Sequence, residues 1–69
     1  MSAENVPSSP EQLAEESVRA TGMLAGKVVF RVWRHRTAEV VVEFTDGTRF
    51  FVDRAEDGVE ISITGGGGE

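Results

Sequence analysis

Segment 31–36, RVWRHR in one-letter code, concentrates the residue types of this chain that are best suited to binding chemistry. Alternate side chains of a strand share a face, so Arg31, Trp33 and His35 would lie together. An aromatic ring beside cations can stack on a nucleobase while the cations contact phosphates. The segment is therefore one candidate polyanion site, with the members Arg31, Trp33, Arg34, His35 and Arg36.

A plainer interpretation of the same segment is favoured. Arg31 and Arg34 would pair with neighbouring acidic residues, and Trp33 would pack at an interface. Ion pairs exposed to solvent contribute little and are weak markers of function. Polyanion binding is therefore kept as the alternative and not as the leading hypothesis.

Catalytic chemistry has little support in the sequence. His35 is the only histidine, and imidazole changes charge near neutral pH, which suits acid–base work. A general base also needs an orienting partner and a pocket, and a short turn between strands is expected to offer neither. Any serine nucleophile would need this same histidine. We predict no catalytic residues and a protein that is not an enzyme.

Metal and cofactor sites are not expected either. The chain has no cysteine and one histidine, which excludes thiolate zinc sites and multi-histidine sites within one chain. The Asp-Gly pairs at 46–47 and 57–58 are explained by turn geometry, and neither has the spacing of a calcium loop. The glycine run 65–68 lacks the helix and lysine of a phosphate loop.

The net charge of −5 is unevenly distributed over the 69 residues: −3 over 1–26, +4 over 27–36 and −6 over 37–69. An acidic total disfavours non-specific attraction to nucleic acid and to anionic membranes, so neither is expected as a partner. The basic segment keeps the polyanion alternative open. A weaker alternative is that the acidic remainder mimics nucleic acid and inhibits a protein that binds it.

The N-terminal sequence lacks the charged and apolar regions of a signal peptide. No apolar run approaches the roughly 20 residues needed to span a bilayer. Together with the absence of cysteine, these features predict a cytoplasmic protein.

A helix is predicted from Pro10 to Thr21, after a disordered polar tail over residues 1–8. Ser9 suits the N-cap, Pro10 suits the first helical position, and Gln12 has the spacing of a capping box. Gly22 is the expected stop. This helix is too short to be stable alone in water, so it must pack on another element.

Apolar alternation predicts four strands, at 27–34, 38–44, 48–54 and 59–64, followed by a flexible glycine-rich tail at 65–69. Residues 45–47, Thr-Asp-Gly, predict a hairpin turn with Gly47 in a left-handed conformation. That turn sets Val42 opposite Phe50, Val41 opposite Phe51 and Glu43 opposite Arg49, which keeps the two faces of the sheet distinct.

The predicted fold is α+β: one domain over residues 9–64, with a helix packed on a four-stranded antiparallel meander in the order 1-2-3-4. The face expected to form the core is apolar almost throughout; its members are Val28, Phe30, Val32, Val40, Val42, Phe44, Phe50, Val52, Ile61 and Ile63. The residues available to cover it are Leu13, Val18, Met23 and Leu24. One short helix is too small for this task, so a homodimer is expected.

The opposite face mixes apolar and charged residues, as the centre of an interface does. Its candidate interface residues are Val29, Arg31, Trp33, Val41, Arg49 and Phe51. The leading hypothesis from the sequence is a small, non-enzymatic protein–protein interaction module that forms a homodimer and takes no cofactor.

Overall fold

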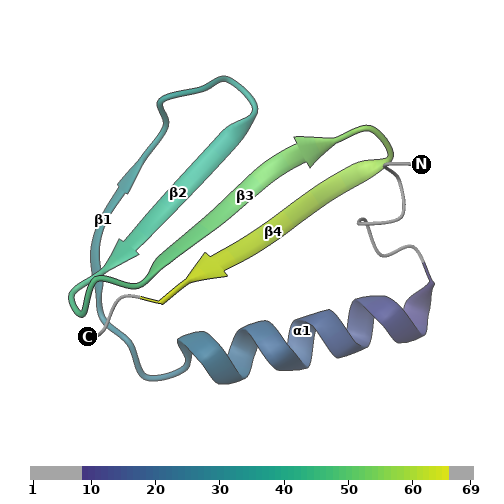
Figure 1. Ribbon diagram of the computed structural model, residues 1–69, viewed down its shortest axis with the longest axis horizontal. Helices are drawn as coiled ribbons and strands as arrows, with labels where there is room; N and C mark the ends of the chain where they lie inside the picture. The colour runs from purple at the N-terminus through teal and green to yellow at the C-terminus, as the bar shows by residue number, and fades with distance from the viewer. Residues whose placement is uncertain (1–8, 66–69) are drawn as a thin grey trace.

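A computed structural model describes residues 9–65 as one helix and one four-stranded antiparallel sheet (Figure 1). The elements are α1 (Pro10–Leu24), β1 (Val29–Trp33), β2 (Glu39–Phe44), β3 (Arg49–Ala55) and β4 (Gly58–Thr64). The strands lie in the order β1-β2-β3-β4. The predicted α+β meander is confirmed. The tail predicted at 1–8 and most of that predicted at 65–69 fall outside the described residues.

The start of α1 is set by the capping box that the sequence predicts. The Ser9 hydroxyl oxygen accepts a hydrogen bond from the Gln12 N–H (3.1 Å), and the Gln12 side-chain oxygen accepts one from the Ser9 N–H (3.3 Å). The predicted stop at Gly22 is wrong, because α1 continues to Leu24. A glycine inside a helix costs only about 1 kcal/mol relative to alanine. The left-handed residue that follows the helix is Gly26, with φ 82°.

The central hairpin, β2–β3, has the predicted register. Val42 lies opposite Phe50, and Glu43 lies opposite Arg49. The loop is closed by hydrogen bonds from the Gly47 N–H to the Phe44 carbonyl and from the Phe44 N–H to the Thr48 carbonyl, both 2.9 Å. Gly47 has φ 93°, the left-handed conformation expected there. β2 and β4 differ from the predicted bounds by one residue at the start, and β3 is shifted by one residue at both ends.

β1 is shorter than predicted and is interrupted by a β-bulge. Val29 lies opposite Phe44 and Arg31 lies opposite Glu43, which leaves Phe30 as the extra residue. Residues directly opposite each other share a face of the sheet. Val29 therefore lies on the face of Phe44, and the prediction that it shares a face with Arg31 and Trp33 is wrong.

The position of α1 differs from the expected cover over the sheet. The helix lies beside β4, and its Ala20 and Met23 line a shallow groove with Ile61 and Ile63 (Figure 1). The face that carries these isoleucines is called the helix-side face; it comprises Val29, Val32, Val40, Val42, Phe44, Phe50, Val52, Ile61 and Ile63. No residue of α1 is buried. The cover of this face expected from Leu13, Val18, Met23 and Leu24 is only partial: Met23 reaches Ile61 and Ile63 and Leu24 is half-buried, whereas Leu13 and Val18 are exposed.

The buried part of the molecule is small and centres on β2. The buried apolar side chains among the described residues are Val41, at 0% exposure, and Phe44. Glu39 and Thr48 are buried polar residues at the two ends of the same hairpin. The two edge strands, β1 and β4, contribute no buried residue.

Candidate functional site

The second face of the sheet, called the outer face, is built from three cross-strand rows on β1–β4. One row carries Arg31, Glu43 and Arg49; the next carries Trp33, Val41 and Phe51; the last carries Glu39, Asp53 and Glu60. The structure thus brings together five of the six residues predicted as an interface, and Val29 is the one that it separates from them.

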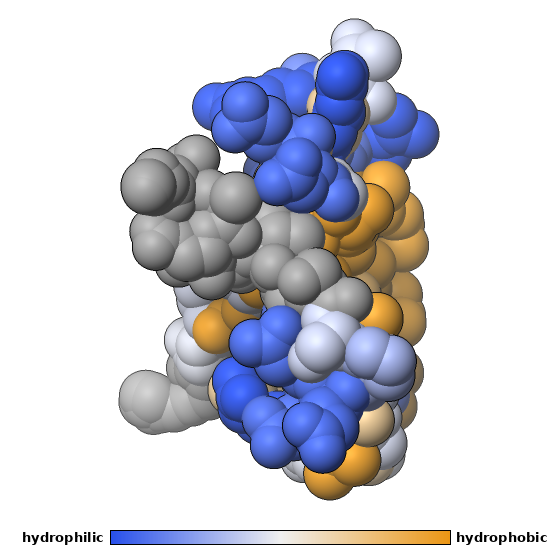
Figure 2. Space-filling view, turned by 90° about the vertical axis from the view of Figure 1, so that its right-hand side faces the viewer, coloured by the Kyte–Doolittle hydropathy of each residue, from blue (hydrophilic) through white to orange (hydrophobic). Residues whose placement is uncertain are grey.

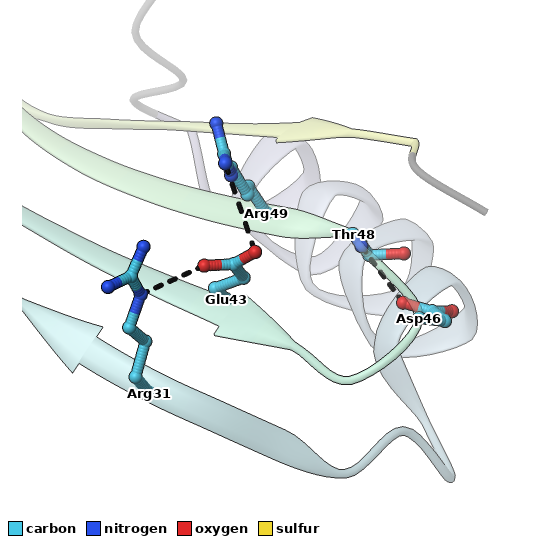
Figure 3. A network of polar contacts seen from close by, with 5 residues as sticks. All are labelled: Arg31, Glu43, Asp46, Thr48 and Arg49. Carbon is cyan, nitrogen blue, oxygen red and sulfur yellow. Dashed lines mark hydrogen bonds and ion pairs between the residues drawn. The ribbon is translucent and has the colours of Figure 1, made fainter. Parts of the chain in front are cut away.

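The first row alternates in charge, and its side chains are joined (Figure 3). Arg31 Nε donates to Glu43 Oε1 at 3.0 Å, and Arg49 Nη2 lies 3.8 Å from Glu43 Oε2. The Glu43 side chain is largely buried between the two arginines. Opposite charges directly across adjacent strands stabilise a sheet. The prediction that Arg31 pairs with a neighbouring acid is confirmed.

Trp33 is held by the same two arginines. The guanidinium carbon of Arg31 lies 4.4 Å from the centre of the indole ring, and that of Arg49 lies 5.8 Å from it. Such cation–π contacts contribute about 0.5–1 kcal/mol each at exposed sites. Val41, directly between Trp33 and Phe51, is fully buried. The outer face therefore covers its own apolar centre.

The basic turn after β1 bonds mainly to itself. Arg34 Nε donates to the Glu39 carbonyl at 2.7 Å, and its Nη2 donates to the Thr37 carbonyl. The prediction that Arg34 pairs with an acidic side chain is wrong, because main-chain carbonyls at the turn accept its hydrogen bonds. The turn geometry thus engages one of the cations assigned to the candidate polyanion site, and Glu43 engages another, Arg31.

His35 has a carboxylate neighbour that the sequence analysis did not expect. Its Nε2 lies 2.9 Å from Oε1 of Glu39, which is an ion-pair distance if the imidazole is protonated. This oxygen makes no hydrogen bond of acceptable geometry among the described residues. The His35 ring therefore lies beside this oxygen without a well-formed hydrogen bond to it. The ring is half-exposed on the turn, an open position that does not favour general base catalysis.

The acidic row of Glu39, Asp53 and Glu60 was not among the predicted site residues. The register that pairs Val41 with Phe51 places the first two opposite each other, so the sequence carried the signal. Like charges directly opposite each other destabilise a sheet.

Residues 9–65 contain no group of three or more histidine, cysteine, aspartate or glutamate side chains placed to hold a metal ion.

A further ion pair ties the start of β1 to the central hairpin. Lys27 Nζ lies 2.5 Å from Asp46 Oδ2. Asp46 Oδ1 accepts a hydrogen bond from the Thr48 N–H at 2.9 Å, as Figure 3 shows. The Lys27 ammonium and then the Thr48 N–H lower the pKa of the Asp46 carboxyl well below its usual range. Both interactions favour the charged carboxylate.

A group of exposed apolar side chains lies along β1 and the residue before it. Its members, called the β1 strip, are Val28, Val29, Phe30 and Val32, each between 52% and 63% exposed. Val29 and Val32 lie on the helix-side face, whereas the ring of Phe30 lies 5.8 Å from the guanidinium carbon of Arg31, which is on the outer face. Figure 2 shows a band of hydrophobic surface along one side of the molecule, between hydrophilic ends. Contiguous exposed apolar surface in a small protein marks an interaction site more often than isolated residues do.

The comparisons add no functional assignment. No helix in the part of the chain that the structure describes is long and apolar enough to cross a membrane. No family model matches the chain, and no curated protein or solved structure is significantly similar to it.

Proposed function

We propose that this protein is a small, non-enzymatic interaction module that forms a homodimer through its β1 strip. The observation that carries the proposal is the exposure of the β1 strip beside a helix that buries no residue. Transfer of apolar surface out of water is worth about 25 cal/mol per Å². A second copy that covers the strip would therefore supply stability that the isolated chain lacks.

Chain length supports a partner of this kind. A domain of about 60 residues buries only about 60% of the surface that its unfolded chain exposes, so its stability is marginal. Small domains usually add disulfides, a metal or a second subunit. The sequence has no cysteine and one histidine, which leaves a second subunit as the natural means of stabilisation.

The proposal moves the interface away from the outer face, which the sequence favoured, to the exposed edge strand β1. Val41 is fully covered by its own neighbours, and Glu43 already joins two arginines. A partner on the outer face would have to displace these contacts before it gained new ones. The β1 strip offers apolar surface with no such competition.

Sedimentation equilibrium of the full chain over a micromolar concentration series tests the proposal. We expect a dimer for the natural sequence. Val32→Lys should give a monomer, because it places a charge inside the proposed interface. Val59→Lys is the matched control: Val59 is 56% exposed, against 57% for Val32, but lies on β4 at the other edge of the sheet.

The control should remain a dimer, and circular dichroism should show the native sheet in both variants. A natural chain that stays monomeric at high micromolar concentration would overturn the proposal. So would a Val32→Lys variant that still forms the dimer.

A further inference from the structure

The molecule has two uncovered apolar surfaces, and one of them is on the helix. Ala20 and Met23 face β4, while Val18 is 72% exposed. Residues two apart on a helix point about 200° from each other, so Val18 points away from the sheet that Ala20 faces. Ala14 and Val18 together line a shallow, largely apolar depression on this far side of α1.

The chain's own helix is not free to cover the β1 strip. Residues 25–28 join α1 to β1, and hydrogen bonds hold both ends of this connection: Lys27 N–H to the Leu24 carbonyl (3.1 Å) and Thr45 N–H to the Val28 carbonyl (2.8 Å). The ion pair between Lys27 and Asp46 fixes its middle. The helix is thereby held next to β4, at the opposite edge of the sheet from β1 (Figure 1).

From these placements, and given the homodimer proposed above, we infer that each copy packs the Ala14–Val18 side of α1 onto the β1 strip of the other copy. The helices then form a layer between two sheets, with one side on their own β4 and the other on the partner's β1. A twofold axis makes the two contacts identical, since residue i meets j and j meets i. Neither protomer has to change its fold.

Charge supports this pairing of surfaces. α1 carries three glutamates, Glu11, Glu15 and Glu16, against Arg19, whereas residues 27–36 carry four cations and no acid. Lys27 and Arg31 are already paired with Asp46 and Glu43, so the positive charge that remains beside the β1 strip comes mainly from Arg34 and Arg36. An acidic helix laid beside this remaining positive charge gives complementary charge at the rim of an apolar contact. Two sheets packed directly on each other through the strip would instead place two basic segments side by side.

Disulfide cross-linking tests the inference cleanly, because the natural chain has no cysteine. Val18→Cys and Val32→Cys are made separately, and each is oxidised alone and after mixing. The inferred contact joins Val18 of one copy to Val32 of the other. The mixture should therefore give a cross-linked dimer on non-reducing gels, and each variant alone should give far less.

Val59→Cys mixed with Val18→Cys is the matched control, because Val59 is as exposed as Val32 but lies on β4. This mixture should not cross-link above the level of the single variants. A chain that carries both Val18→Cys and Val32→Cys should form cross-linked dimers and not an internally closed monomer.

The outcomes separate this inference from the proposed function. Efficient cross-linking of Val32→Cys with itself would indicate sheet-on-sheet packing and overturn the inference, as would an internally closed monomer of the double variant. A dimer in sedimentation without the mixed cross-link would overturn only the inferred geometry. A monomer in sedimentation would overturn the homodimer itself.

Discussion

The two faces of this sheet contain similar apolar residues but cover them to different extents. On the outer face, Val41 lies on the inner strand β2 between Trp33 and Phe51 and is removed entirely from solvent. On the helix-side face, Val32 lies on the edge strand β1 with Val42 opposite it, and it is more than half exposed. The difference shows that a valine in this sheet is covered where strands on both sides bring large side chains to it. Arg31 and Arg49, which lie over the indole ring, complete the outer face around Trp33.

Removal of the Trp33 indole ring should cause the largest loss of stability, because it uncovers the apolar centre of the outer face. Trp33→Ala uncovers Val41 and leaves Arg31 and Arg49 without their aromatic contact. Truncation of a buried aromatic residue costs about 3–5 kcal/mol, and Trp33 is only partly buried, so we expect about 2 kcal/mol. Urea denaturation followed by circular dichroism measures the loss.

Trp33→Phe is the control for this variant, because it keeps an aromatic face for the arginines. It should lose less than half as much free energy of unfolding as Trp33→Ala. Equal losses in the two variants would show that the cation–π contacts do not hold the cover in place.

The sequence predicted the hairpin β2–β3 well, for a local reason. The loop at 45–47 and the opposite charges of Glu43 and Arg49 both specify the same register, which the structure has. The Ser9 capping box likewise specified the start of α1. These are interactions between residues close in sequence, so the sequence is sufficient to reveal them.

The sequence did not reveal where the side chains of β1 switch from one face of the sheet to the other, or where the helix lies. The bulge at Phe30 moves Val29 to the helix-side face, and no turn residue marks it. The placement of α1 along β4 depends on the connection through Gly26 and on tertiary contacts. The partners of Arg34 and His35 depend on the shape of the turn, which composition does not give.

A second prediction concerns the exposed β1 strip. If a partner covers the β1 strip, only the folded dimer is stabilised, so thermal stability must rise with protein concentration. Each tenfold increase should add about 1.4 kcal/mol to the free energy of unfolding per dimer. Scanning calorimetry at several concentrations measures this shift. Val32→Lys should abolish the shift, whereas Trp33→Ala should lower the melting temperature and leave the concentration dependence in place.

The charged row of the outer face should have a smaller effect. Glu43→Gln removes the charge that joins Arg31 to Arg49, and pairs with partly exposed arginines contribute about 0.2–1 kcal/mol. We expect a loss within that range in low salt and a smaller loss in high salt, where exposed charges are screened. Glu56→Gln, in the exposed β3–β4 turn, is the control and should change stability less. A loss that does not depend on salt would mean that Glu43 acts through packing.

The smallest expected effect concerns the ion pair between Lys27 and Asp46, which holds the start of β1 against the hairpin. It is measured as the dependence of the free energy of unfolding on pH. The pKa of Asp46 is lower in the folded protein than in the unfolded chain, so its charged form favours folding. Its contribution is fully present well above the unfolded pKa of about 3.9 and is lost as pH falls through the folded value. Asp46→Asn should therefore lower the free energy of unfolding by a constant amount near neutral pH. The difference from the natural chain should shrink below about pH 4, as the unfolded carboxyl becomes protonated.

Urea titrations from pH 7 to acid measure this difference, with Asp57→Asn in the other Asp-Gly turn as the matched control. A gap that widens in acid would reverse the assigned sign and show that the Lys27 contact does not lower the pKa of Asp46.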